Sequence, residues 1–169
     1  MDRFNNYIID GFNVGFKLSN AQRLLQNGDT DRAIPIILQH IDSAMPQGVK
    51  RIIVIFDGQG TSHQNHSIPK RIQVKFSKKP QTADDIIRKF IRSAKTPKEW
   101  TVVSSDNEIL FTARDHGAET IGSDDFIRQN NDPGATKRSF NEHLEKYEPG
   151  NVDVDYWMNL FGSADTDDD

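Results

Sequence analysis

No cysteine occurs among the 169 residues of this chain. Disulfide scaffolds, thiolate zinc sites and cysteine nucleophiles are therefore excluded. Long apolar runs are absent too, since the longest ones, such as residues 52–56, fall far below the roughly 20 residues of a membrane helix. The first residues show no basic segment followed by an apolar core, so no secretory signal is expected. We predict a soluble, cytoplasmic protein with no membrane partner.

Glycine and proline are present at ordinary frequency, with 11 and 7 residues, which excludes low-complexity and collagen-like chains. The length suits one domain, and no linker long enough to divide the chain is visible. We expect residues 1–162 to form a single domain. The last residues, 163–169, contain four aspartates, and we expect them to form a disordered acidic tail.

Short runs rich in β-branched residues alternate with helical patterns along the chain. Such runs are typical of strands buried on both faces of a parallel sheet, and the alternation predicts an α/β fold with a mainly parallel central sheet flanked by helices. The expected strands cover residues 7–9, 51–56, 72–76, 100–103 and 119–121, with 72–76 at an edge of the sheet. The expected helices cover residues 30–45, 83–94, 107–116 and 136–147, and a short apolar segment covers 154–161.

Positive charge is concentrated in residues 70–98, which hold ten basic and two acidic residues, a net charge of +8. This density indicates a polyanionic partner such as nucleic acid. The alternative is a solvated helix face and loop, in which Arg88 and Lys89 pair with Asp84 and Asp85. The candidate contact residues for nucleic acid are Lys70, Arg71, Lys75, Lys78, Lys79, Arg88 and Arg92.

Three of the expected strands are followed by an aspartate, at Asp10, Asp57 and Asp106. Because ligands of open parallel sheets bind at the carboxyl ends of the strands, these carboxylates are expected to share one edge of the sheet. Two acidic pairs accompany them: residues 84–85 begin a helical pattern, and residues 124–125 follow the last strand.

Each of these aspartates also has a purely structural interpretation. Asp10 and Asp57 precede glycine and suit turns, and Asp106 suits the N-cap of the helix that follows. The segment ending at Asp85 has the pattern of a capping box, with Asp in place of the usual Glu or Gln. A helical wheel places Asp84 at the border of the apolar stripe and Asp85 away from it. Asp84 is therefore the better site candidate and Asp85 the better cap.

Clustered carboxylates repel one another, and a divalent cation relieves that repulsion. Mg²⁺ or Mn²⁺ suits a site built from carboxylates with open positions for water. Such a site can activate water and neutralise charge on a phosphodiester. An acidic pocket beside a basic surface that holds a polyanion is the pattern of a nuclease, although other metal-dependent phosphoryl-transfer sites share it.

Five motifs occur in order along the chain: IIDGFNV at residues 8–14, VIFDG at 54–58, TADDII at 82–87, VVSSD at 102–106 and GAETI at 117–121. They resemble the motifs of the NYN domain, in particular its YacP-like branch among the PIN-like nucleases, and cover roughly residues 6–130. The resemblance implies a three-layer α/β fold, a bound Mg²⁺ or Mn²⁺, and endoribonuclease activity. It also implies RNA as the partner, since some bacterial members of the family are associated with ribosomes and with cleavage of mRNA.

The resemblance assigns roles by position. Asp10, Asp84 and Asp106 would bind the metal, and Asn13 would orient a metal-bound water or the phosphate. Weaker supporting roles fall by position to Asp57 and Asp124. Asp85, Ser105 and Asp125 are further supporting candidates beside them. The region after Asn13 and residues 131–169 do not match the family pattern, so the substrate is not assigned more closely.

Other functions compete with a nuclease. An RNA- or ribosome-binding module with the same fold and no cleavage is the main alternative. A phosphatase of the haloacid dehalogenase type would need a second aspartate where Phe12 stands, and a receiver domain would need paired acids after the first strand. No G-x-G-x-x-G motif follows that strand, which argues against dinucleotide binding. His63 and His66 suit either a metal site or, more readily, an RNA contact from a loop.

Overall fold

The computed structural model describes residues 6–58 and 68–131. Its strands are β1 (Asn6–Asp10), β2 (Ile52–Phe56), β3 (Ile72–Phe76), β4 (Trp100–Ser104) and β5 (Glu119–Gly122). Its helices are α1 (Gly11–Gly15), α2 (Ser19–Gln26), α3 (Thr30–Ala44), α4 (Ala83–Ser93), α5 (Asn107–Asp115) and α6 (Ser123–Asn131), with a short 3₁₀ turn at Pro97–Glu99. All five expected strands are confirmed, as are the helices expected at residues 30–45, 83–94 and 107–116.

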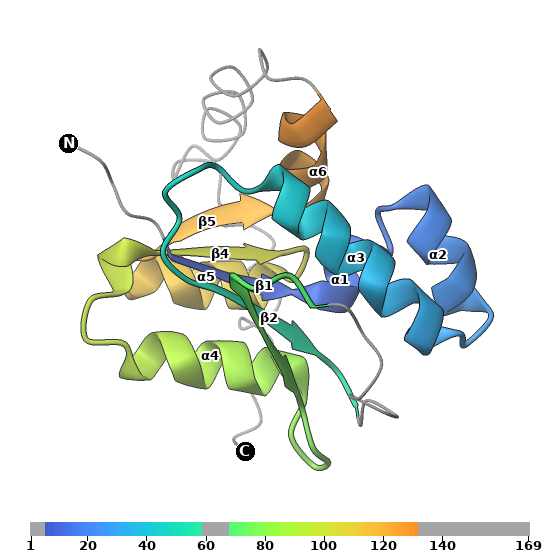
Figure 1. Cartoon of the computed structure of the whole chain (residues 1–169). Coiled ribbons are helices and arrows are strands. Elements are labelled where there is room, and N and C mark those ends of the chain that lie inside the picture. Colours follow the sequence, from blue (N-terminus) through green and yellow to red (C-terminus); the bar gives the residue numbers. More distant parts are fainter. Residues whose placement is uncertain (1–5, 59–67, 132–169) are drawn as a thin grey trace, which may run out of the picture. The chain divides into compact units, whose positions relative to one another are not determined.

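The five strands form one parallel sheet in the order β3-β2-β1-β4-β5 (Figure 1). β3 lies at an edge, as predicted. Ile9 of the central strand β1 aligns with Val54 of β2 on one side and with Val103 of β4 on the other. After β1 the chain builds one half of the sheet and then crosses to β4 on the other side. The switch in strand order between β1 and β4 is where open α/β sheets bind their ligands.

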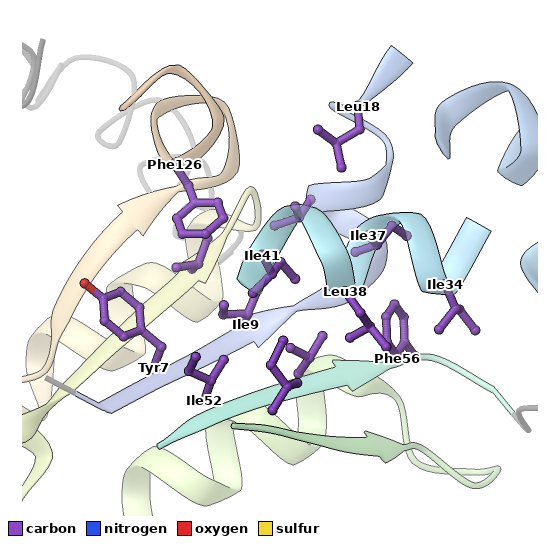
Figure 2. Packing of buried hydrophobic residues seen from close by; sticks show 14 of the residues in the cluster. Tyr7, Ile9, Leu18, Ile34, Ile37, Leu38, Ile41, Ile52, Phe56 and Phe126 are labelled. Carbon is purple, nitrogen blue, oxygen red and sulfur yellow. The ribbon is translucent and has the colours of Figure 1, made fainter. Parts of the chain in front are cut away.

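Helices cover both faces of this sheet, which gives the expected three layers (Figure 1). Successive side chains of a strand point to opposite faces. Ile9 and Val54 therefore pack in the cluster that includes residues of α3 and α6, part of which Figure 2 shows. Their neighbours Ile8 and Ile53 pack in the second cluster, with residues of α4 and α5. The strands are apolar on both faces because both faces are covered.

The sequence did not predict α1 and α2. With only five residues, α1 is too short to show a helical period, and Asp10 caps it where the sequence suggested a turn. A Cβ atom at Gly11 would lie 2.3 Å from the ring of Phe56, so glycine allows α1 to approach β2 closely. This close packing fixes α1, and with it Asn13, directly after the end of β1.

Several predictions fall outside the described residues. These are the helical segments 136–147 and 154–161, the acidic tail 163–169, and His63 and His66. The single-domain boundary at residue 162 therefore stays a prediction. Among the helices of the described part, none is long and apolar enough to span a membrane.

Candidate active site at the carboxyl edge of the sheet

Three aspartates come together at the carboxyl edge of the sheet. Asp10 ends β1, Asp106 follows the adjacent strand β4, and Asp84 lies in the first turn of α4. Partial burial, the negative charges of Asp10 and Asp106, and a hydrogen bond with Asp106 raise the pKa of Asp84 to about 6. Arg88 opposes this rise. The three carboxylates are thus close enough to repel one another, and we call them the aspartate group.

Asp10 is the most buried member of the group, at 5% exposure. Its burial raises the pKa of its carboxyl group, and the charges of Asp57 and Asp106 act in the same direction. Asn13 opposes this with two hydrogen bonds: its backbone N–H donates to Oδ1 of Asp10 at 3.2 Å, and its side-chain amide donates to Oδ2. Asn13 therefore holds the Asp10 carboxylate in place and favours its charged form.

A serine joins the two halves of the site. The Ser104 hydroxyl is fully buried at the end of β4 and accepts from the side-chain amide of Asn13 at 3.4 Å and from the backbone N–H of Asp106 at 3.0 Å. The sequence assigned a supporting role to Ser105, which is exposed. The sequence feature that could have indicated Ser104 is a hydroxyl residue at the end of a run typical of a buried strand.

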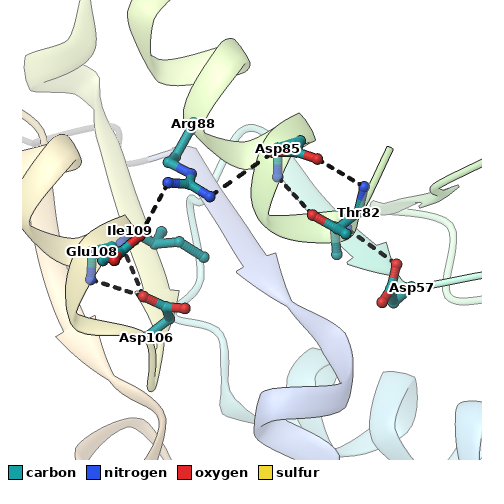
Figure 3. A network of polar contacts seen from close by, with 8 residues as sticks. Asp57, Thr82, Asp85, Arg88, Asp106, Glu108 and Ile109 are labelled. Carbon is teal, nitrogen blue, oxygen red and sulfur yellow. Dashed lines mark hydrogen bonds and ion pairs between the residues drawn. The ribbon is translucent and has the colours of Figure 1, made fainter. Parts of the chain in front are cut away.

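Asp106 and Asp85 also act as helix caps, as predicted. Asp106 accepts from the backbone N–H groups of Glu108 at 2.8 Å and Ile109 at 3.3 Å, at the start of α5 (Figure 3). Asp85 forms the expected capping box with Thr82, and these hydrogen bonds lower the pKa of its exposed carboxyl group. Asp85 is therefore a cap that lies outside the aspartate group. Asp106 is both a cap and a member of that group.

Asp57 lies at the same edge of the sheet, but its carboxylate is hydrogen-bonded to other residues of the domain. Its Oδ1 accepts from the hydroxyl of Ser77 at 2.6 Å and from the backbone N–H of Ala83 at 3.3 Å. The buried Ser77 hydroxyl also accepts from the backbone N–H of Gly58 at 3.0 Å. Because Ala83 is the first residue of α4, Asp57 fixes the start of the helix that carries Asp84. Its position is that of a support behind the aspartate group.

We expect Asp57→Ala to lower the free energy of unfolding by about 1–2 kcal/mol, because it removes an acceptor at the start of a helix. Asp57→Asn retains an acceptor oxygen and should cost less than half as much. Urea denaturation of both variants, with Ser77→Ala as the matched loss of the donor, measures this. An equal loss in the Asn and Ala variants would show that the charge, and not the hydrogen bonds, matters.

The acidic pair at residues 124–125 lies in the first turn of α6. Oδ2 of Asp124 lies 2.9 Å from Nζ of Lys17, an ion pair that links the start of α6 to the turn after α1. Asp125 is half-buried in the first turn of α6, with a carboxylate oxygen near Gly122. Neither adds to the repulsion that raises the pKa of Asp84, so the structure does not place these two aspartates with the other three.

The family model of the YacP-like NYN domain matches residues 7–154, most of the chain. The chain belongs to the YacP-like NYN domain family. Two crystal structures of Rae1 (YacP) from Bacillus subtilis share the fold of this NYN domain. One has 19% identity and a TM-score of 0.63 and covers 92% of this chain and 91% of that chain. A tryptophan-to-leucine mutant has 21% identity and a TM-score of 0.58, with 84% and 82% covered. No curated protein matches the chain.

Membership of the YacP-like NYN family indicates a nuclease fold, and such nucleases generally use a divalent metal. Within residues 6–58 and 68–131, no three acidic or histidine side chains are already arranged to enclose an ion. The donor chemistry nevertheless fits one. Asp10, Asp84 and Asp106 are hard oxygen donors, and burial together with the neighbouring negative charges of Asp10 and Asp106 raises the pKa of Asp84. A divalent cation would balance them.

The structure places the candidate RNA-binding residues of this NYN domain in different environments. Lys78 and Lys79 are exposed in the loop that leaves the carboxyl end of β3, on the same edge as the aspartate group. Arg71 is instead engaged within the fold, since its guanidinium donates to Asp42 at 2.6 Å. Three further candidates are exposed: Lys70 before β3, Lys75 on β3 and Arg92 on α4.

Proposed function

We propose that this protein is a metal-dependent endoribonuclease that hydrolyses phosphodiester bonds of RNA at the carboxyl edge of its sheet. The supporting observation is the convergence of Asp10, Asp84 and Asp106, where burial and then the charges of Asp10 and Asp106 raise the pKa of Asp84 to about 6. Its substrate is cytoplasmic RNA, including mRNA on the ribosome. The lysines on the same edge suit a polyanion, and the absence of cysteine suits a reducing compartment.

Asp10, Asp84 and Asp106 would hold Mg²⁺ or Mn²⁺. When bound, the ion would supply an acidified water and neutralise charge on the phosphodiester. The side-chain amide nitrogen of Asn13 is used by Asp10 and Ser104, which leaves its carbonyl oxygen to accept a hydrogen bond from a water molecule. Asn13 therefore both holds Asp10 and can orient the water that attacks the phosphorus.

Incubation of the purified protein with mixed RNA, including fractions of translating ribosomes, tests this function. The reactions contain Mn²⁺, Mg²⁺ or EDTA. We expect internal cuts in the presence of either metal and none in EDTA. Sequencing of the new RNA ends then gives the cleavage sites and shows whether the ribosome is required.

An RNA-binding module without cleavage is the second candidate. The observation in its favour is that no three acidic or histidine side chains in the described part of the chain are arranged to enclose an ion. Retained RNA binding without cuts under any metal condition would support this candidate and contradict the nuclease.

We expect Lys78→Glu combined with Lys79→Glu to weaken RNA binding at least about tenfold and to flatten its salt dependence, because phosphate contacts release counterions. The matched control is Lys95→Glu with Lys98→Glu, which makes the same charge change beyond the other end of α4. Binding of labelled RNA at several salt concentrations measures both effects. Equal weakening by the two double variants would contradict a specific role for the β3–α4 loop.

A further inference from the structure

Arg88 lies on α4, the helix that carries Asp84, and contacts α5, the helix that Asp106 caps. It extends from α4, and its guanidinium reaches the first turn of α5, where Nη1 lies 3.3 Å from Oε2 of Glu108 (Figure 3). Its Nη2 lies 3.8 Å from Oδ1 of Asp85. Its charge also acts on Asp84, whose pKa it lowers. An arginine thus borders the place where the scissile phosphodiester would bind.

The present partners of Arg88 hold it weakly. The Glu108 side chain is 80% exposed and the Asp85 side chain 49% exposed, and exposed ion pairs contribute little because water screens them. The contact with Glu108 uses only one of the five N–H donors of the guanidinium. Phosphate oxygens match the planar fork of arginine in two-point contacts, so they are a better partner than a single exposed carboxylate.

We propose that Arg88 binds a phosphate of the RNA backbone beside Asp84 and Asp106, and that Glu108 occupies its guanidinium until RNA displaces it. The inference rests on the proposed function, since it takes RNA as the ligand. Glu108 is then an internal competitor of the substrate, and it also keeps the arginine extended toward α5 in the RNA-free protein. Arg88 compensates phosphate charge next to a group of carboxylates that would otherwise repel it.

Binding of a short labelled single-stranded RNA of mixed sequence, measured by fluorescence anisotropy in EDTA, tests the proposal without cleavage. We expect Arg88→Ala to weaken binding about tenfold and to lower the salt slope by about one. Glu108→Gln should tighten binding about two- to fivefold, the range set by the loss of an exposed ion pair. Glu108→Ala should do the same, with no acceptor left for Arg88.

Matched controls separate competition from a general charge effect. Asp115→Asn removes one negative charge at the other end of α5 and should leave affinity unchanged. Arg32→Ala removes an exposed arginine of α3 that pairs with Asp29, the N-cap residue of that helix, and should also have no effect. Thermal unfolding of each variant confirms that it is folded.

The decisive comparison is Glu108→Gln in the Arg88→Ala background. If Glu108 competes for Arg88, the second substitution changes nothing once Arg88 is absent. Equal tightening in both backgrounds would overturn the proposal, as would no tightening in the single variant. Failure of the proposed nuclease function looks different, because the unmodified protein would then cut no RNA with Mn²⁺ or Mg²⁺ whatever the binding data show.

Discussion

Asp106→Asn should reduce metal-dependent cleavage of RNA at least about 100-fold while the protein stays folded. Even outer-shell partners of metal ligands typically contribute 10–100-fold, and Asp106 would be a ligand itself. Asparagine caps helices about as well as aspartate, so the hydrogen bonds at the start of α5 should survive. The variant therefore removes charge from the site and leaves the fold in place. Gel analysis of RNA incubated with Mn²⁺ measures the loss.

The control for this result is Asp115→Asn, the same acid-to-amide change at the far end of the same helix. It should cleave RNA at the rate of the unmodified protein. Circular dichroism and the thermal midpoint show whether both variants are folded. Full activity in Asp106→Asn, with the fold intact, would remove Asp106 from the proposed site.

Asp84→Asn should stabilise the metal-free protein at neutral pH. In the folded state the pKa of Asp84 rises to about 6, from an ordinary value of 3.8. The ionised carboxylate therefore destabilises the fold above pH 6, and this cost disappears as protonation proceeds between about pH 6 and pH 4. One pKa unit corresponds to about 1.4 kcal/mol, but Asp84 is only partly buried, and screening by solvent reduces the effect to about 1 kcal/mol.

The measurement is the free energy of unfolding of both proteins in EDTA at pH 7.5 and at pH 4. We expect the asparagine variant to be more stable at the higher pH and equal at the lower pH. Addition of Mg²⁺ at pH 7.5 should stabilise the unmodified protein more than the variant, because the ion balances the charge that asparagine lacks. Asp85→Asn is the control. Hydrogen bonds of the capping box lower the pKa of Asp85, so this substitution should not stabilise the protein at pH 7.5. A constant difference across pH would show that Asp84 does not carry the repulsion.

Much of the fold could be predicted because its signals are local. Runs such as residues 52–56 are apolar at every position, which requires cover on both faces, and the capping box at the start of α4 is visible in the sequence. The wheel separated Asp84 from Asp85 because helical geometry fixes their directions. Placement of Asp10 and Asp106 at one edge followed from parallel strands, although their adjacency depends on the pairing of β1 with β4, which no local pattern reveals.

The parts that could not be predicted depend on contacts between distant residues. Ser104 accepts from Asn13, which lies 91 positions earlier in the sequence, and nothing near Ser104 indicates that partner. Asp57 resembles a turn residue, yet its carboxylate accepts from the backbone N–H of the first residue of a helix that begins 26 residues later. The helix α1 is too short to show a period, so the position of Asn13 relative to Asp10 came from the family resemblance alone.

The most direct test of the central claim is diffraction from crystals soaked in Mn²⁺, measured at a wavelength where manganese scatters anomalously. We predict a peak within coordination distance of carboxylate oxygens of Asp10, Asp84 and Asp106, lost in crystals of Asp84→Asn. A peak bound to other residues only, or none at saturating Mn²⁺, would contradict a metal site at the carboxyl edge of this sheet.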